Sequence, residues 1–251
     1  MNRPDVVQLR QFYSSALGRI VRHYLAKAVQ AHWSGLQGDL VLGLGYATPV
    51  LRPYYELQAK GSLSVLAAMP ADQGGVYWPS HQENRTILTD DYRLPFADNV
   101  MNRMILLHEL EHVEQEQGLL QELWRVLTPG GRMLVLVPNR RRIWSGSPLS
   151  PFSYGKPYSI HQLREALCEG LFTHVHTSST LFFRPTNVRW LQKTARFFHL
   201  IGKLFCPMMG GVIIMEVEKQ IYASVREKER LRSRAYIHVT APQPALSCDG
   251  K

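Results

Sequence analysis

Cysteine is scarce in this sequence of 251 residues. The three cysteines, Cys168, Cys206 and Cys248, lie far apart, form no CxxC pair and are odd in number. This pattern excludes the disulfide framework of a small secreted domain and a paired-cysteine redox motif. We therefore expect the protein to occupy a reducing compartment, the cytoplasm.

Long apolar segments are also missing. The amino-terminal residues carry charged and polar side chains where a signal peptide has an apolar run. The most apolar later stretch, 197–217, is interrupted by Lys203, and its longest uncharged piece, Leu204–Met215, is too short to span a bilayer. We expect no transmembrane segment.

Acidic residues are few relative to basic ones, 20 against 29, which gives a formal net charge of +9. Such an excess can indicate a polyanionic partner. Much of it is scattered, however, apart from a short run at Arg140–Arg142 and a longer one at Arg226–Arg234, which also contains Glu227 and Glu229. We interpret these residues as solvated surface, so a nucleic-acid partner is not favoured, although charge alone does not exclude one.

Apolar residues alternate between helix-length and strand-length segments. Helical spacing occurs in Val6–Trp33, Tyr46–Leu57, Glu109–Leu127 and Ser159–Glu169, and strands are expected at Asp39–Gly45, Ser62–Met69, Asn84–Thr89, Val100–Leu107, Arg132–Val137 and Val212–Val217. Strands that alternate with helices form βαβ units and a parallel sheet, which predicts an α/β fold. The segment Arg140–Tyr158, rich in proline, glycine and aromatic residues, is predicted to be a long loop or lid.

The same pattern suggests one main domain with two appendages. We expect an N-terminal helical segment at 1–38, the α/β domain at 39–222 and a basic C-terminal helix or tail at 223–251. No internal repeat and no clear second domain is evident.

Ligands of parallel α/β sheets bind beyond the carboxyl ends of the strands. In this chain, the strands are followed by Gly43–Tyr46, Ala68–Pro70, Asp90–Tyr92 and Leu107–His108. These four short segments are therefore predicted to surround one crevice.

A series of short motifs then resembles the methyltransferase type 11 family of class I methyltransferases. The motifs are Leu94-Pro95-Phe96, His108-Glu109-Leu110-Glu111-His112-Val113, Leu119–Leu127, Thr128-Pro129-Gly130-Gly131, Val137-Pro138-Asn139 and a later helix that ends at Gly170-Leu171-Phe172. Each is weak alone, but their order and spacing over about Val41 to Phe172 are fairly specific. The segments Gly43–Pro49 and Pro148–Tyr158 resemble a divergent, alphaproteobacterial-looking subgroup.

The resemblance implies a Rossmann-like class I methyltransferase fold, with a mostly parallel seven-stranded sheet and helices on both faces. It also implies S-adenosylmethionine as cofactor and transfer of its methyl group to an acceptor, which we expect to be a small molecule. The residues expected to bind the cofactor are Gly43, Gly45, Tyr46, Met69, Asp90, Asp91, Tyr92, Leu107 and Tyr13, and His108 is the candidate catalytic base. Tyr13 also suits a core position on the first helix.

Several positions depart from the family pattern. Gly43 stands where the family pattern has an acidic residue, and Ala47 and Pro49 stand where it has glycines. The second strand ends without a carboxylate for the ribose hydroxyls, unless Asp72 folds back toward the crevice. A second hypothesis therefore stays open, in which the domain has kept the fold, lost its chemistry and serves as a binding or scaffold subunit for a protein partner.

Two other functions, zinc-dependent proteolysis and nucleic-acid methylation, each have a characteristic motif that can be compared with this sequence. His108-Glu109-Leu110-Glu111-His112 matches the HExxH pattern of zinc proteases, in which two histidines on one helix bind the metal. Because this run begins at a strand end within a βαβ pattern, we expect no metal and interpret Glu109, Glu111 and His112 as the first turn of a helix. Nucleic-acid methylation is not favoured, because the fourth strand lacks a following Asn/Asp-Pro-Pro-aromatic run.

Overall fold

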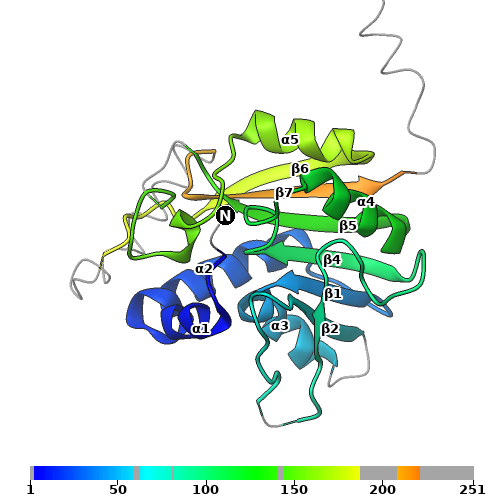
Figure 1. The fold of residues 1–251 in the computed structure, drawn as a ribbon, viewed down its shortest axis with the longest axis horizontal. Coiled ribbons are helices and arrows are strands. Elements are labelled where there is room, and N and C mark those ends of the chain that lie inside the picture. The colour runs from blue at the N-terminus through cyan, green and yellow to red at the C-terminus, as the bar shows by residue number, and fades with distance from the viewer. Residues whose placement is uncertain (1–2, 59–62, 81, 141–143, 187–207, 221–251) are drawn as a thin grey trace, which may run out of the picture. The chain divides into compact units, whose positions relative to one another are not determined.

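The computed structural model describes residues 3–58, 63–80, 82–140, 144–186 and 208–220. Among these residues, seven strands form one sheet in the order β3-β2-β1-β4-β5-β7-β6 (Figure 1). The strands are β1 (Leu40–Gly45), β2 (Ser64–Pro70), β3 (Thr86–Thr89), β4 (Met101–Leu107), β5 (Leu127–Pro138), β6 (Phe172–Thr180) and β7 (Val212–Lys219). β7 runs antiparallel to both neighbours, and the other strand pairs are parallel. The predicted class I methyltransferase fold is confirmed.

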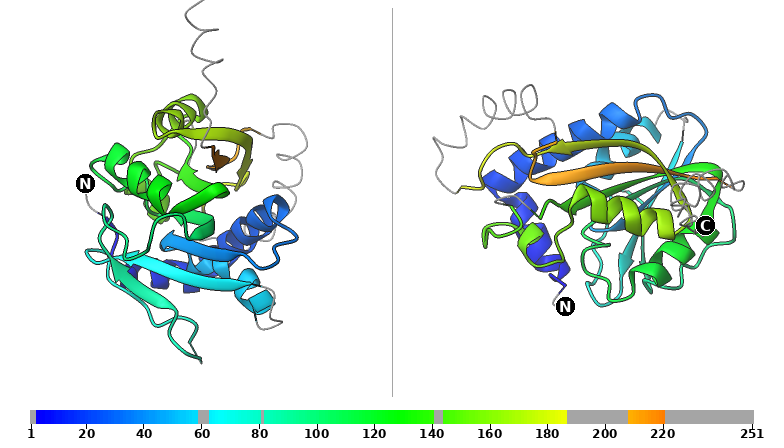
Figure 2. Two further views of the ribbon diagram at one scale, coloured as in Figure 1. Left: turned by 90° about the vertical axis from the view of Figure 1, so that its right-hand side faces the viewer. Right: turned by 90° about the horizontal axis from the view of Figure 1, so that it is seen from above.

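The helices cover both faces of this sheet. They are α1 (Val6–Ser14), α2 (Ala16–His32), α3 (Thr48–Gln58), α4 (Glu116–Val126) and α5 (Ile160–Glu169), with a short 3-10 helix, η1, at Pro151–Ser153. α1, α2 and α3 lie on one face, and α4 and α5 lie on the other (Figures 1 and 2). None of the described helices is long and apolar enough to cross a membrane.

Alternating strand residues divide the interior into two cores. On β1, Val41 packs in the core under α1, α2 and α3, whereas its neighbour Leu42 packs in the core under α4 and α5. On β4, Ile105 packs in the first of these cores and Leu106 packs in the second. Because successive side chains of a strand point to opposite faces, a strand with helices on both sides must be apolar throughout. This explains why these strands read as continuous apolar runs in the sequence.

The predicted single helix over Val6–Trp33 is wrong, because the chain breaks at Ser15. Ser15 is extended (φ −66°, ψ 166°), ends α1 and caps α2 by accepting a hydrogen bond from the Gly18 amide. A β-carbon on Gly18 would lie 1.8 Å from the Phe12 carbonyl oxygen. Only glycine therefore lets the two helices approach this closely, and apolar periodicity alone does not reveal the break.

The predicted helix over Glu109–Leu127 is also wrong in its first part, since α4 begins only at Glu116. His108 has a left-handed backbone (φ 56°), and the His112 amide donates to the Glu109 carbonyl in a tight turn. Glu109, Glu111 and His112 thus belong to a turn between β4 and α4. The interpretation of these residues as a helical first turn is wrong. The zinc-protease motif requires its two histidines on one helix, and His108 and His112 do not lie on one.

Smaller differences concern the predicted turn and the chain termini. The predicted turn at 128–131 is part of the long strand β5, with Gly130 in a left-handed conformation (φ 71°). The predicted helix at Ser159 is confirmed as α5, which opens with a capping box between Ser159 and Gln162. The tail predicted at 223–251 and the arginines at 141, 142 and 226–234 lie outside the described residues.

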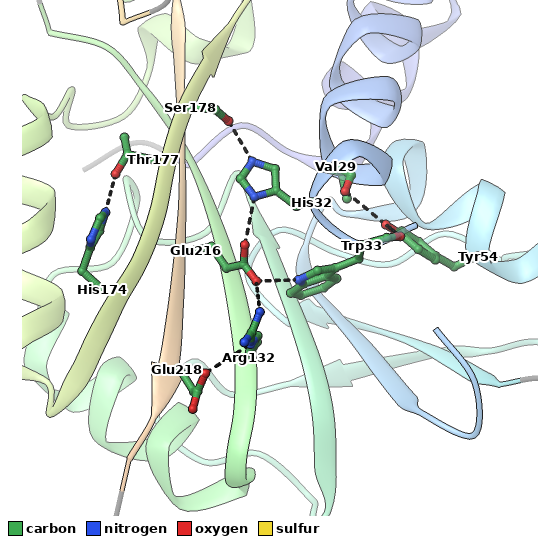
Figure 3. A network of polar contacts seen from close by, with 10 residues as sticks. All are labelled: Val29, His32, Trp33, Tyr54, Arg132, His174, Thr177, Ser178, Glu216 and Glu218. Atoms are coloured by element: carbon green, nitrogen blue, oxygen red, sulfur yellow. Dashed lines mark hydrogen bonds and ion pairs between the residues drawn. The ribbon is translucent and has the colours of Figure 1, made fainter. Parts of the chain in front are cut away.

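A buried carboxylate ties the end of α2 to the sheet (Figure 3). Glu216 on β7 is 4% exposed and accepts hydrogen bonds from Trp33 Nε1 (3.0 Å) and Arg132 Nη1 (3.2 Å). Its other oxygen lies 3.0 Å from His32 Nδ1, and His32 Nε2 lies 2.8 Å from the Ser178 hydroxyl. Burial by itself raises the pKa of Glu216, but these partners outweigh it and lower the pKa from 4.5 to about 2.

Replacing Gly18 by alanine is expected to destabilise the protein. In most helix interiors this change stabilises by about 1 kcal/mol, because alanine has the higher helix propensity. Here the new methyl group would collide with the backbone of α1, so we expect a loss of about 2 kcal/mol or more. Urea unfolding checks this, with Gly118→Ala in α4 as the control, since its nearest neighbour is the displaceable Tyr92 ring at 3.1 Å. Equal effects of the two changes would contradict the account of the α1–α2 contact.

Replacing Glu216 by glutamine should lower the free energy of unfolding at pH 7 by about 2–3 kcal/mol, because Arg132 and Trp33 lose a charged acceptor. A lowered pKa stabilises the fold above pH 4.5, and this contribution disappears as the pH falls toward about 2. The difference between wild type and variant should therefore narrow across that window. Glu56→Gln, at a 67% exposed site, is the control. A difference that stays constant from pH 5 to about pH 2 would contradict the assignment.

Candidate functional site

The carboxyl ends of β1, β2, β3 and β4 meet at one edge of the sheet, as predicted. Gly45 pairs with Leu107 and Pro70 pairs with Thr89 in the strand register. The Tyr46 amide continues this contact by donating to the Leu107 carbonyl over 2.8 Å. The four segments expected to surround a crevice are therefore brought together.

The two glycines of β1 have different reasons to be glycine. Gly45 is left-handed (φ 71°), and a β-carbon there would lie 2.4 Å from the Leu107 carbonyl oxygen and 2.9 Å from the Glu109 carboxylate. Gly43 is packed instead under α3, where a β-carbon would lie 2.4 Å from the Leu51 side chain. Packing against the protein thus explains both residues, and their role toward a cofactor stays a prediction.

Two of the three predicted residues at the end of β3, Asp90 and Tyr92, are exposed. Asp90 is exposed, and its Oδ1 accepts a hydrogen bond of 2.8 Å from the Tyr92 amide. Tyr92 is 40% exposed, and its hydroxyl accepts from the Gln115 amide (3.2 Å). Met69 and Leu107, by contrast, are fully buried in the core. Only the backbone of these two residues can line the crevice.

Arg3 is the residue at this site that the sequence analysis missed. Its guanidinium is 5% exposed and binds Asp91 through two hydrogen bonds of 3.0 and 2.6 Å. The same group donates to Asp72 (3.1 Å) and lies 3.9 Å from Glu109. Asp72 therefore does fold back toward the crevice. No local pattern marks Arg3, because its partners lie 69 or more positions away.

Glu109 is a second buried group that the sequence did not single out as functional. Burial raises the pKa of its carboxyl well above 4.5; the positive charge of Arg3 opposes this shift, and Asp91 adds to it. Burial thus favours the uncharged form of Glu109, and the hydrogen bonds of Arg3 go to Asp91 and Asp72.

His108, Tyr13 and Glu111 form a buried chain of polar contacts. The Tyr13 hydroxyl lies 2.9 Å from His108 Nε2, and His108 Nδ1 lies 3.2 Å from Glu111 Oε1. His108 is fully buried, with the Phe152 ring centred 4.6 Å from its own. Burial raises the pKa of Tyr13 well above 10, so its hydroxyl stays protonated. Tyr13 is a core residue, as one reading of the sequence expected, and it also stacks on Tyr46 (5.6 Å, 21°).

A cavity of about 690 Å³ opens beside these two tyrosines. Its walls come from α1, α2, α3, the residues 76–80 after β2 and Gln82. Its basic and aromatic lining residues are Arg10, Arg22, Arg52, Tyr13, Tyr46, Tyr55, Tyr77 and Trp78. This mixture of ring faces and cationic groups suits a compact organic molecule with a polar or anionic end.

Comparison with known proteins supports this description of the fold. Residues 63–135 match a family described as a methyltransferase domain, which confirms the resemblance to the type 11 family over that part of the chain. A possible histamine N-methyltransferase from Thermotoga maritima, S-adenosylmethionine-dependent by its name, has the same fold. Its TM-score is 0.61 at 13% identity, over 86% of this chain and 96% of that one. A methyltransferase from Aquifex aeolicus superposes with a TM-score of 0.59 at 12% identity, over 85% and 98% of the two chains.

Two curated relatives match over parts of their length. A ubiquinone/menaquinone biosynthesis C-methyltransferase from Chromobacterium violaceum is 37% identical over 65 residues, 26% of this chain and 25% of the relative. Norajmaline N-methyltransferase from Rauvolfia serpentina is 23% identical over 175 residues, 66% of this chain and 58% of the relative. The chain thus spans about a quarter of one relative and somewhat more than half of the other.

Replacing Arg3 by glutamine should lower the free energy of unfolding by about 2–4 kcal/mol, because it leaves Asp91 and Asp72 close together without their cation. The loss should persist in high salt, since a buried ion pair is screened much less than an exposed one. Urea unfolding at low and high ionic strength measures both points. Arg19→Gln is the matched control, because Arg19 is exposed and its guanidinium donates to the nearby Ser14 carbonyl. Equal stability of the two variants would show that Arg3 does not hold this edge together.

Proposed function

We propose that the protein is an S-adenosylmethionine-dependent methyltransferase that acts on a small-molecule acceptor. The observation that carries the proposal is the methyltransferase domain at residues 63–135, set in a class I methyltransferase fold whose strand ends converge on one crevice. The cavity beside Tyr13 and Tyr46 supports the acceptor class, because its volume of about 690 Å³ lies in the range of small-molecule pockets.

The residues at the crevice fit the cofactor's adenosine end. Hydroxyl and amino groups need acceptors, and Asp72, Asp90 and Asp91 provide carboxylates just past the ends of β2 and β3. Asp90 offers Oδ2, which has no hydrogen-bond partner in the described part of the chain. Asp72 takes the place of the carboxylate that the end of β2 lacks, because it folds back to the same guanidinium as Asp91. An adenosine bound here would compete with Arg3 for these two groups.

The left-handed turn at Gly45 and the tyrosines beyond it fit the other end of the cofactor. Tyr13 and Tyr46 present stacked rings at the cavity wall, and aromatic faces favour a cationic sulfonium. When bound, S-adenosylmethionine supplies an electrophilic methyl group. The chain's own part is then to hold the acceptor in line and exclude water, and proximity and orientation alone can dominate such a transfer.

A base role for His108 meets a geometric constraint. The ring is fully buried and has a partner at each nitrogen, so it cannot touch an acceptor directly. Proton transfer to His108 would have to pass through the Tyr13 hydroxyl, which belongs to a residue of the cavity wall. Transfer to an acceptor atom that attacks without first losing a proton, such as an amine nitrogen, needs no such route.

Calorimetric titration with S-adenosylmethionine and S-adenosylhomocysteine tests the cofactor assignment. We expect micromolar affinity, on the order of −8 kcal/mol. Asp90→Asn should weaken binding by about 1–2 kcal/mol, because it removes a charged acceptor at the adenosine end. Glu165→Gln on the exposed side of α5 is the control, at a site 63% exposed. Absence of binding at millimolar ligand would overturn the proposal, and equal affinity of Asp90→Asn and wild type would remove Asp90 from the site.

A further inference from the structure

Three side chains of metal-ligand type converge directly after β4. His108, Glu111 and His112 each place one ligand atom within 4.8 Å of the others, and all three residues are buried. They come from the turn that the left-handed backbone of His108 creates, and not from a helix. Neither the fold nor the proposed methyl transfer accounts for this cluster.

Two of these residues carry buried polar atoms that nothing in the described structure satisfies. Both ring nitrogens of His112 lack a hydrogen-bond partner, although the residue is only 4% exposed. Glu111 Oε2 is likewise buried without a partner. Buried polar atoms that stay unpaired are unfavourable by about 1–3 kcal/mol each, so their presence together points to a missing ligand.

The contacts of His108 leave the correct nitrogen for a metal. Its Nδ1 faces Glu111, whereas its Nε2 faces the Tyr13 hydroxyl at 2.9 Å. When Nε2 carries the proton and donates it to the Tyr13 oxygen, Nδ1 has a free lone pair on the side of the cluster. Histidines that bind metals commonly use the other nitrogen in this way, which fixes the ring and its tautomer.

We propose that His108 Nδ1, a ring nitrogen of His112 and the Glu111 carboxylate bind a Zn²⁺ ion at the end of β4. Two imidazoles and one carboxylate are a known zinc set that leaves the fourth position open. Bonds of about 2.0–2.2 Å place such ligand atoms roughly 3.4 Å apart, so the present spread of up to 4.8 Å needs side-chain shifts of about 1 Å.

The proposed site differs from the zinc-protease pattern in its residues as well as its backbone. In that pattern Glu109 would activate water, but here Glu109 points to Arg3 and Gly45. Glu111, which the pattern leaves out, supplies the carboxylate. His108 then acts as a ligand and not as a base, which is consistent with its complete burial.

The ion would lie beneath the segment that follows β5. The Phe152 ring covers His108, a β-carbon on Gly155 would lie 2.5 Å from the Glu111 side chain, and the Lys156 amide donates to the Glu111 carbonyl. Binding would thus fix the Glu111 turn against this covering segment. We expect added Zn²⁺ to raise the melting temperature of the metal-free protein, and Mg²⁺ to have no such effect, because imidazole is a poor ligand for Mg²⁺.

The test uses the untagged full chain, stripped with a chelator and titrated with Zn²⁺ and Co²⁺. We expect one equivalent of Zn²⁺ to bind and Co²⁺ to show the intense visible bands of a four-coordinate ion. Glu111→Gln and His112→Asn should weaken Zn²⁺ binding at least tenfold. His161→Asn, at an exposed site on α5, should bind as wild type does.

X-ray absorption of the wild-type protein with Zn²⁺ keeps the test independent of how the variants fold. Two imidazoles and an oxygen ligand in the first shell would support the site, whereas a sulfur ligand would overturn it. Failure to retain one equivalent of Zn²⁺, or equal binding by His112→Asn and His161→Asn, would also overturn it. None of these readouts depends on S-adenosylmethionine, so the outcome is separate from that of the cofactor titration.

Discussion

The left-handed backbone of His108 is the constraint on which the rest of the site depends. The apolar spacing of Glu109–Leu127 predicted that the strand ending at Leu107 would lead straight into the helix that covers it. A positive φ at this residue is unfavourable by about 1–2 kcal/mol, and it turns the chain at once. Glu109 is thereby directed to Arg3 and Gly45, while Glu111 turns back to His108, whose ring packs against Phe152. One backbone angle thus separates the Arg3 edge from the cluster of two imidazoles and a carboxylate.

These two groups have different electrostatic roles. At the charged edge, Arg3 brings Asp72 and Asp91 together over the ends of β2 and β3, where an adenosine would need acceptors. In the cluster, the buried Glu111 carboxylate lies beside the imidazole rings of His108 and His112. A cofactor would compete with Arg3 at the first group, and a metal ion would complete the second. Neither event requires the other.

Much of the fold could be predicted because local sequence reports burial on a sheet with helices on both faces. The continuous apolar runs at 40–45 and 101–107 predicted the central strands, and Ser159 marked the start of α5. The places where helices are interrupted or begin late were harder to predict from the sequence. Ser15 interrupts an apolar pattern that continues in phase across it, and the turn at 108–115 lies where acidic residues normally open a helix. In both places tertiary packing outweighs local preference, through the Gly18 contact in one case and the left-handed His108 in the other.

The sequence by itself therefore determined the α/β layers and most of the strands, and it predicted the edge of the sheet at which a ligand would bind. It did so because periodicity, glycine turns and motif spacing are local properties of the chain. Only the tertiary structure decided which side chains meet at that edge. At that edge, Arg3 reaches Asp91 across 88 positions and Tyr13 reaches His108 across 95. Away from the edge, Glu216 reaches His32 across 184. Such contacts depend on how α1, α2 and the late strand β7 are placed against the sheet, and no short stretch of sequence carries that information.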